Sequence, residues 1–139
     1  MRLRRLALLL LVIAAAALAA ALPATGKDGV KATLTTLVPL GSPAGTQLKV
    51  VWTLAYVDEQ GRRHPFGGGG IFVRLLSASG AGAETAFARR QAGRYAATVP
   101  VPKGGIRDIQ VGIRGWVSGP TGTRRSDVLF PITNDPVPG

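Results

Sequence analysis

The sequence predicts an all-β domain, an antiparallel β-sandwich of about seven strands, preceded by an N-terminal signal or anchor helix. After residue 29, short segments of alternating apolar and polar residues follow one another, separated by Gly- and Pro-rich turns at intervals of roughly 8 to 15 residues. No helical period of apolar residues occurs in this part of the sequence. A helix is predicted only for residues 1–21, where a basic start is followed by a continuous apolar run.

The N-terminal 21 residues have the layout of a secretory signal. Three arginines precede an apolar run over residues 6–22, whose length lies between that of a signal core and that of a membrane span, so cleavage and retention both stay open. Small residues at Ala19 and Ala21 favour cleavage after Ala21. We therefore expect an exported protein, either secreted or anchored on the outer face of the cytoplasmic membrane.

The expected organisation has one folded domain. The four segments are 1–21 (signal peptide or uncleaved membrane anchor), 22–29 (linker), 30–133 (β-sandwich domain) and 134–139 (flexible C-terminal tail). The chain has no cysteine, which excludes a lipoprotein anchor and any disulfide. Packing alone must therefore stabilise the domain.

The first predicted strands lie in the N-terminal half of the domain. Residues 30–40 are rich in β-branched side chains and stop at a proline and a glycine. Residues 46–58 alternate most clearly, and we expect Trp52 to be buried between two sheets. The large apolar positions of this segment are Leu48, Val50, Trp52, Leu54 and Tyr56.

The next predicted strand covers residues 71–76, with three apolar side chains on one face: Ile71, Val73 and Leu75. The remaining predicted strands are 85–90, 94–101, 108–116 and 126–133. In the 108–116 strand, Gly112 and Gly115 face away from the apolar side. Another backbone is expected to approach closely there, or a bulge to form.

Four consecutive glycines, Gly67 to Gly70, precede the strand at 71–76. A phosphate-binding loop of this kind leads into a helix and is usually followed by Lys and Ser or Thr. Here a strand follows and no such residues occur, so the run is interpreted as a flexible or bulged entry to the strand. The functional alternative is a recognition loop with a mobile basic and aromatic tip beside it.

The segments "DEQGRRHPF" and "GRYAATVPVPKGGIRDIQVGIRGW", with the glycine-rich approach to "IFVRLL" between them, resemble the YtkA-like and FixH-like families of exported bacterial domains. The resemblance covers about residues 50–116. It implies an immunoglobulin-like sandwich in the bacterial envelope. For some relatives it also implies copper handling or cytochrome oxidase assembly.

The residue types argue against metal or catalytic chemistry. Copper prefers thiolate, thioether or imidazole ligands, and the chain has one histidine, His64, one methionine, Met1, and no cysteine. No G-x-S-x-G occurs, and the carboxylates lie at predicted strand ends or turns. We therefore expect no metal, no other cofactor and no enzymatic activity.

The chain is strongly basic, with 17 Lys and Arg against 7 Asp and Glu, and its formal charge of +10 falls to +7 when the three signal arginines are removed. Such a charge favours anionic lipids and teichoic or nucleic acid polymers, without predicting specific nucleic-acid binding. The arginines cluster in three predicted turns, at 62–63, 89–94 and 124–125. If these turns converge they form a binding surface; if they scatter they only keep the surface soluble. The candidate binding residues are Arg62, Arg63, His64, Phe66, Arg89 and Arg90.

The expected function is that of a non-enzymatic exported envelope domain, a binding or assembly module. Its expected partner is an unidentified envelope protein or an acidic polymer, with membrane contact through the N-terminal helix if that helix is uncleaved. One alternative is a basic polyanion-binding module that uses the arginine-rich turns. The other is a metal or redox accessory protein, which the family resemblance implies and the lack of His, Met and Cys disfavours.

Overall fold

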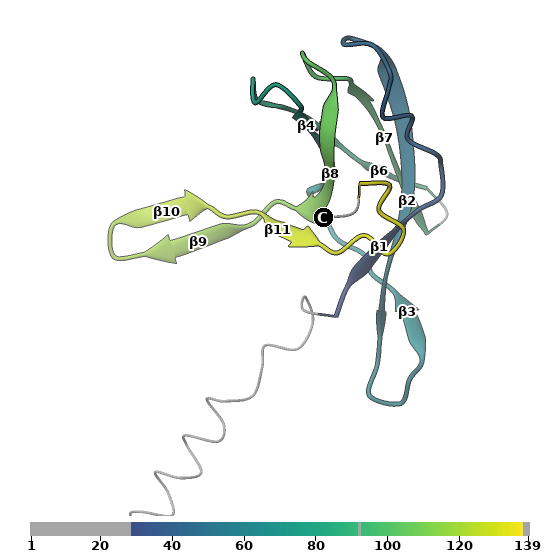
Figure 1. The fold of residues 1–139 in the computed structure, drawn as a ribbon. Coiled ribbons are helices and arrows are strands. Elements are labelled where there is room, and N and C mark those ends of the chain that lie inside the picture. Colours follow the sequence, from purple (N-terminus) through teal and green to yellow (C-terminus); the bar gives the residue numbers. More distant parts are fainter. Residues whose placement is uncertain (1–28, 92, 138–139) are drawn as a thin grey trace, which may run out of the picture.

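The computed structural model describes residues 29–91 and 93–137. The predicted signal or anchor segment, and the predicted linker up to residue 28, lie outside the described residues. Within those ranges the secondary structure consists of strands without a helix, and the antiparallel all-β prediction is confirmed (Figure 1). The strands are β1 (Lys31–Leu34), β2 (Gln47–Val57), β3 (Arg63–Pro65), β4 (Ile71–Ser77), β5 (Ala83–Phe87), β6 (Arg89–Gln91), β7 (Arg94–Pro100), β8 (Ile106–Ile113), β9 (Trp116–Gly119), β10 (Gly122–Arg125) and β11 (Val128–Phe130).

The strands form two sheets and one separate hairpin. The first sheet has the order β1-β2-β7-β6, and β3 pairs with the end of β2 beyond the stretch that pairs with β7. The second sheet has the order β11-β8-β4-β5. Strands β9 and β10 pair with each other and project away from the two sheets (Figure 1). Residues 29–91 and 93–137 contain no helix that is long and apolar enough to cross a membrane.

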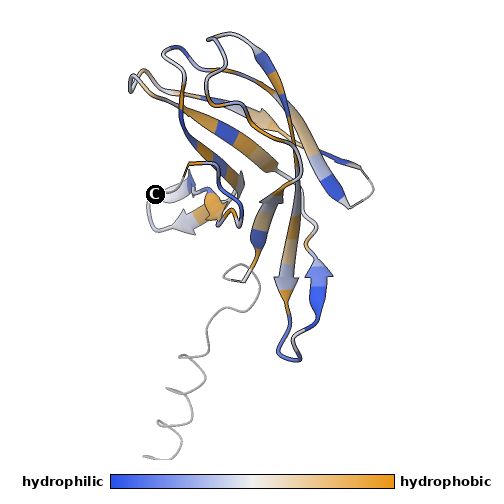
Figure 2. Cartoon of the chain, turned by 45° about the vertical axis from the view of Figure 1, so that its right-hand side comes forward, coloured by the Kyte–Doolittle hydropathy of each residue, from blue (hydrophilic) through white to orange (hydrophobic). Residues whose placement is uncertain are grey.

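Both sheets contribute to one hydrophobic core. In β2 the buried side chains alternate with partly exposed ones, and Trp52 is fully buried, as predicted. Its ring stacks on that of Tyr95 in β7 at a centroid distance of 6.1 Å. Strand β4 contributes the three residues predicted for its inner face: Ile71, Val73 and Leu75. Figure 2 shows apolar residues concentrated in the sheet strands and hydrophilic ones along β3.

The C-terminal segment covers the outer edge of β1. Ala32 forms an isolated parallel bridge with Ile132. Beyond it, the amide of Asn134 replaces a backbone partner: its Oδ1 accepts a hydrogen bond from the Leu34 N–H at 2.9 Å, and its Nδ2 donates one to the Leu34 carbonyl at 2.8 Å. Asn134 is the first residue of the predicted tail, so the segment after β11 connects the second sheet to the first.

The predicted strand at 30–40 is too long, because β1 ends at Leu34. The Thr35 N–H still donates to the Val51 carbonyl at 2.8 Å, but the Val51 N–H donates to the side-chain hydroxyl of Thr36 at 3.1 Å instead of to a backbone carbonyl. The side chain therefore takes the place of the next ladder bond, and Pro39, which has no N–H, follows.

The predicted strand at 85–90 is divided between the two sheets. Strand β5 pairs with β4 up to Phe87, the Ala88 N–H donates to the Ile71 carbonyl at 2.8 Å, and Arg89 begins β6 in the first sheet. Short elements such as β3, β6, β9 and β10 raise the count within the described residues above the predicted seven. Periodicity does not detect them because strands of three or four residues are too short to show it.

Candidate functional site

Five exposed cations lie on the side of the first sheet that faces away from the core. In β2 and β7 the buried side chains occupy every second position, so the residues between them point outward. Directly opposed residues of an antiparallel pair share a face, and this extends the assignment to the neighbouring strands. We call these five residues the basic face: Lys31, Lys49, Arg63, Arg89 and Arg94. The register pairs that place them are Lys31 with Ala55, Lys49 with Thr98, Arg63 with Val57, Arg89 with Ala96, and Arg94 with Gln91.

The basic face lacks neutralising carboxylates. Within the described residues, no strand of the first sheet contains an Asp or Glu. The ion pairs of the described chain use Asp58, in the turn after β2, and Asp127, before β11, and none involves a residue of the basic face. The charges of the face therefore add, and together they produce a positive potential over one side of the sheet.

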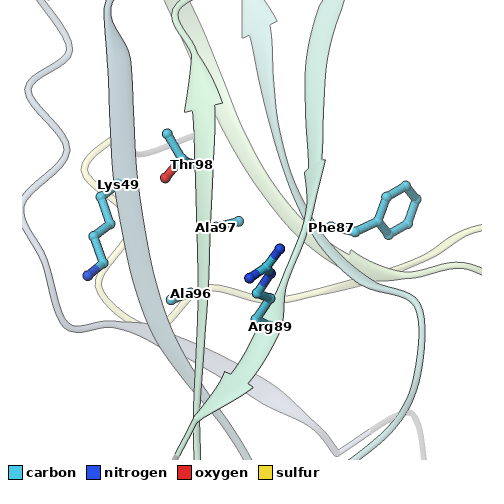
Figure 3. A pocket seen from close by; sticks show the side chains of 6 residues that line it. All are labelled: Lys49, Phe87, Arg89, Ala96, Ala97 and Thr98. Atoms are coloured by element: carbon cyan, nitrogen blue, oxygen red, sulfur yellow. The ribbon is translucent and has the colours of Figure 1, made fainter.

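A hollow of about 380 Å³ lies on this side of the first sheet, next to the end of β5 (Figure 3). Figure 3 shows Arg89 on one side of β7 and Lys49 on the other, with the Lys49 side chain extending from β2 away from β7; the ring of Phe87 points away from the other labelled side chains. The small side chain of Ala96, on the outward face of β7 between the two cations, leaves the space open. The lining residues are Lys49, Phe87, Arg89, Ala96, Ala97 and Thr98.

Three of the predicted binding residues, Arg62, Arg63 and His64, lie in the hairpin that joins β2 to β3. Asp58 organises its turn, because one carboxylate oxygen accepts the N–H groups of Gln60 and Arg62 at 2.9 and 2.8 Å. The other oxygen lies 2.7 Å from His64 Nε2 and 3.0 Å from Arg62 Nε. The hydrogen bond from His64, followed by those from Arg62, holds the pKa of Asp58 below its ordinary value of 3.8.

His64 and Arg62 therefore have partners within their own turn. The imidazole also stacks on the ring of Tyr56 at a centroid distance of 5.2 Å. Arg63 differs from both, because its register places it on the basic face.

Phe66 is a structural residue rather than an exposed aromatic tip. Its ring is partly buried and packs edge-on against Phe130 at a centroid distance of 5.6 Å. Its carbonyl accepts the hydroxyl hydrogen of Tyr95 at 3.0 Å. These contacts connect the start of the glycine run to both sheets.

The glycine run carries the chain from β3 in the first sheet to β4 in the second. The guanidinium of Arg90 lies against it, since a Cβ on Gly67 would stand 3.1 Å from Arg90 Nη1. Gly70 has a φ of +75°, and a Cβ there would stand 3.3 Å from Arg114 Cβ. The run leads into β4 as predicted, and Gly70 is favoured at its end because its backbone has a positive φ and Arg114 approaches it closely.

The structure brings together members of two of the three predicted arginine clusters. Arg63 from the first and Arg89 and Arg94 from the second share the basic face, whereas Arg90 points to the opposite side of β6 with its register partner Tyr95. The third cluster lies on β10 in the projecting hairpin. There Arg125 pairs with Asp127 at 3.1 Å, so this cluster belongs to another surface.

Sequence reasoning missed Lys31, Lys49 and Thr98 as members of the site. The alternation of β2 already separates Lys49 from the Trp52 face, and this signal was available. The sequence did not show which strands pair. In the structure β7 pairs with β2, where Lys49 lies opposite Thr98, and with β6, where Arg89 lies opposite Ala96.

A second apolar cluster, on the outer side of the second sheet, was also missed. Phe72 is fully buried although it lies outside the core cluster, and the Arg74 guanidinium stands 4.6 Å from its ring centre. Phe87 packs edge-on against it at 6.2 Å, and the Arg114 guanidinium lies 4.1 Å from the Phe87 ring centre. Arginines therefore cover both rings.

Within residues 29–91 and 93–137, no three or more His, Cys, Asp or Glu side chains gather where they could hold a metal ion. Comparison of the chain with protein families, curated proteins and solved structures finds no match.

Proposed function

We propose that this protein is a non-enzymatic, exported binding module built on an immunoglobulin-like β-sandwich, and that its basic face binds a phosphate-bearing anionic polymer of the cell envelope. The observation that carries the proposal is the group of five exposed cations on one sheet face whose strands contain no carboxylate. This function requires no cofactor and no catalytic group.

The sandwich is supported by the core, to which both sheets contribute side chains from alternate strand positions. Export is supported by the basic and then apolar N-terminal segment. Together they describe a domain that presents one cationic sheet face outside the cytoplasm, where wall polymers and lipid head groups supply phosphate.

The surface between the cations favours a polymer over a membrane. The outward neighbours of Lys49 and Arg89 are Thr98 and Ala96, which are short and insert little into a bilayer. Of the large exposed apolar side chains in the described residues, Val57 alone stands at an outward strand position of this sheet. Membrane-surface binding normally combines cations with large apolar side chains that enter the interface, whereas an extended polyanion needs only a row of cations.

The test is binding of the exported protein to immobilised inorganic polyphosphate at increasing salt concentration. Wild-type affinity should fall steeply with salt, because cation–phosphate contacts release counterions. A basic-face variant that keeps the hollow intact is Lys31→Gln/Arg63→Gln/Arg94→Gln. Its affinity for polyphosphate should be lower than that of wild type by a factor of about ten or more.

A matched control removes the same number of Lys and Arg charges elsewhere: Lys103→Gln/Arg107→Gln/Arg124→Gln. These side chains are exposed and lie outside the first sheet. The control should retain most of the affinity. Equal loss in both variants would show that net charge alone is responsible and would overturn the basic face as the site.

Vesicles of phosphatidylglycerol and phosphatidylcholine, at matched total phosphate, test the membrane as the source of phosphate. We expect weaker binding to vesicles than to polyphosphate. The reverse order would contradict a polymer ligand.

A further inference from the structure

We infer that the hollow between Lys49 and Arg89 binds one tetrahedral phosphate group, and thereby gives the basic face a preference for phosphate over carboxylate polymers. This inference rests on the proposed function, because it identifies which anionic group that face recognises. The hollow has two cations in its lining and no acidic residue, so its positive charge is complementary to that of an anion.

Strand register brings the donors together. Lys49 in β2 lies opposite Thr98 of β7, and Arg89 in β6 lies opposite Ala96 of β7. Ala96 and Thr98 are two residues apart, so their side chains point to the same face of the sheet. The two cations therefore stand on the strands that flank β7, with Cα atoms about 12 Å apart for ideal strand spacing and rise. Because both side chains are long and flexible, their charged ends can approach one ion from opposite sides.

The three donors match the geometry of phosphate. The planar Arg89 guanidinium can donate two parallel N–H bonds to two phosphate oxygens, and the Lys49 ammonium can donate to a third. The Thr98 hydroxyl, on the strand between them, can donate to an oxygen as well. A carboxylate has only two oxygens, which lie in one plane. If the Arg89 guanidinium donates to both, no third oxygen is left for the Lys49 ammonium.

Neither cation has a competing partner within the described residues. Lys49 and Arg89 take part in none of the ion pairs of residues 29–91 and 93–137, and the hydroxyl of Thr98 has no hydrogen bond there. A ligand therefore does not have to displace a protein carboxylate. The volume of about 380 Å³ is more than ten times the roughly 30 Å³ that a water molecule occupies in the liquid, so a phosphate fits with part of the chain that carries it.

The backbone at Arg89 is held in position. The hydrogen bond from the Ala88 N–H to the Ile71 carbonyl marks the change of sheet, and Phe87 is anchored by packing against Phe72. The ring of Phe87 faces Arg114 and not the hollow. The start of β6 is therefore fixed from the second sheet. At Arg89 only the side chain, and not the backbone, must become ordered on binding, as must the side chain of Lys49.

The experiment is titration of the exported protein with inorganic tripolyphosphate and with citrate at constant ionic strength, followed through the backbone amide signals of residues 96–98. We expect tripolyphosphate to shift these signals at lower concentration than citrate. The double variant Lys49→Gln/Arg89→Gln should weaken tripolyphosphate binding by about tenfold or more, because it removes two charge-assisted contacts. The control Lys31→Gln/Arg63→Gln loses the same charge from the basic face outside the hollow and should stay within about threefold of wild type.

Arg89→Lys separates the guanidinium geometry from simple charge. It keeps the net charge and removes the fork, so tripolyphosphate should bind several-fold more weakly while retention on polyphosphate changes little. Equal tripolyphosphate affinity in Arg89→Lys and wild type, or equal loss of affinity in the two double variants, would overturn the hollow as the phosphate-binding site.

The two proposals fail in different ways. Polyphosphate binding that depends on the basic face but is insensitive to Lys49→Gln/Arg89→Gln would overturn the hollow and leave the proposed function standing. Tripolyphosphate binding at residues 96–98 without polyphosphate binding would support phosphate binding in the hollow and overturn the proposed polymer function.

Discussion

Replacing Gly112 by Ala perturbs the outer side of the second sheet at a tightly packed point. Gly112 lies in β8 opposite Phe72 of β4 and Leu129 of β11. A Cβ at this position would stand 2.6 Å from Phe72 Cζ and 2.7 Å from the Val128 carbonyl oxygen. Ordinary contacts between carbon atoms are about 3.5 to 4.0 Å, so the ring or the backbone must move by on the order of 1 Å.

The surroundings of Phe72 resist this movement. Its ring is fully buried, covered by the Arg74 guanidinium, and packed against Phe87. Overpacking a site of this kind costs about 1 to 3 kcal/mol. The loss of glycine freedom in the unfolded chain offsets about 0.4 to 1 kcal/mol of that cost. The Cβ would meet a backbone oxygen as well as the ring, which places the cost in the upper part of its range, so the free energy of unfolding should fall by about 1 to 2 kcal/mol.

Urea denaturation, followed by tryptophan fluorescence, measures this change. Gly41→Ala is the matched control, because a Cβ there meets nothing within 4 Å and its φ is not positive. The control should lie within about 0.5 kcal/mol of wild type. If Gly112→Ala were as stable as Gly41→Ala, the packing argument would be refuted. Phe72→Leu in the Gly112→Ala background should be less costly than Phe72→Leu alone, because the two sites share one space.

Three further predictions follow from the core, the C-terminal segment and the β2–β3 turn. Trp52→Ala should lower the free energy of unfolding by about 3 to 5 kcal/mol, because the fully buried ring leaves a cavity; a loss below about 1 kcal/mol would misplace the core. Asn134→Ala should cost about 1 to 3 kcal/mol in urea denaturation, since it removes both side-chain bonds to the Leu34 backbone; unchanged stability would refute that role. Asp58→Asn should lower Tm above pH 3.8, with the difference disappearing as pH falls through the lowered pKa of Asp58, and a difference that persisted in acid would contradict its electrostatic origin.

Particular residues show how far periodicity reached. The inner faces of β2 and β4 were predicted correctly except at Tyr56, because strict alternation in a half-buried strand places every second side chain in the core. Tyr56 is exposed, since the end of β2 extends beyond the core into the hairpin with β3. The close approach at Gly112 and Gly115 was also confirmed, since a Cβ on either would collide with neighbouring backbone atoms. Both predictions depend on information within a single strand.

Phe66, which the recognition-loop alternative placed at a mobile tip, is instead partly buried, and the sequence could not show this for a different reason. An aromatic residue beside a basic turn and four glycines has no local feature that distinguishes a mobile tip from a packed one. Its burial depends on Phe130, which lies far along the chain and belongs to the other sheet. The same holds for Asn134, whose partner Leu34 lies near the other end of the described chain.

The sequence by itself determined that this is a basic, cysteine-free, all-β domain, with Trp52 on the apolar side of its clearest strand, because composition and period-two alternation are local properties. Only the tertiary structure decided which cations share a face. Lys49 and Arg89 are neighbours because β7 pairs with β2 on one side and β6 on the other, and because the chain changes sheet at Ala88. Strand order and register are set by packing and hydrogen bonding between distant segments, and these interactions leave no periodic signal in either segment alone.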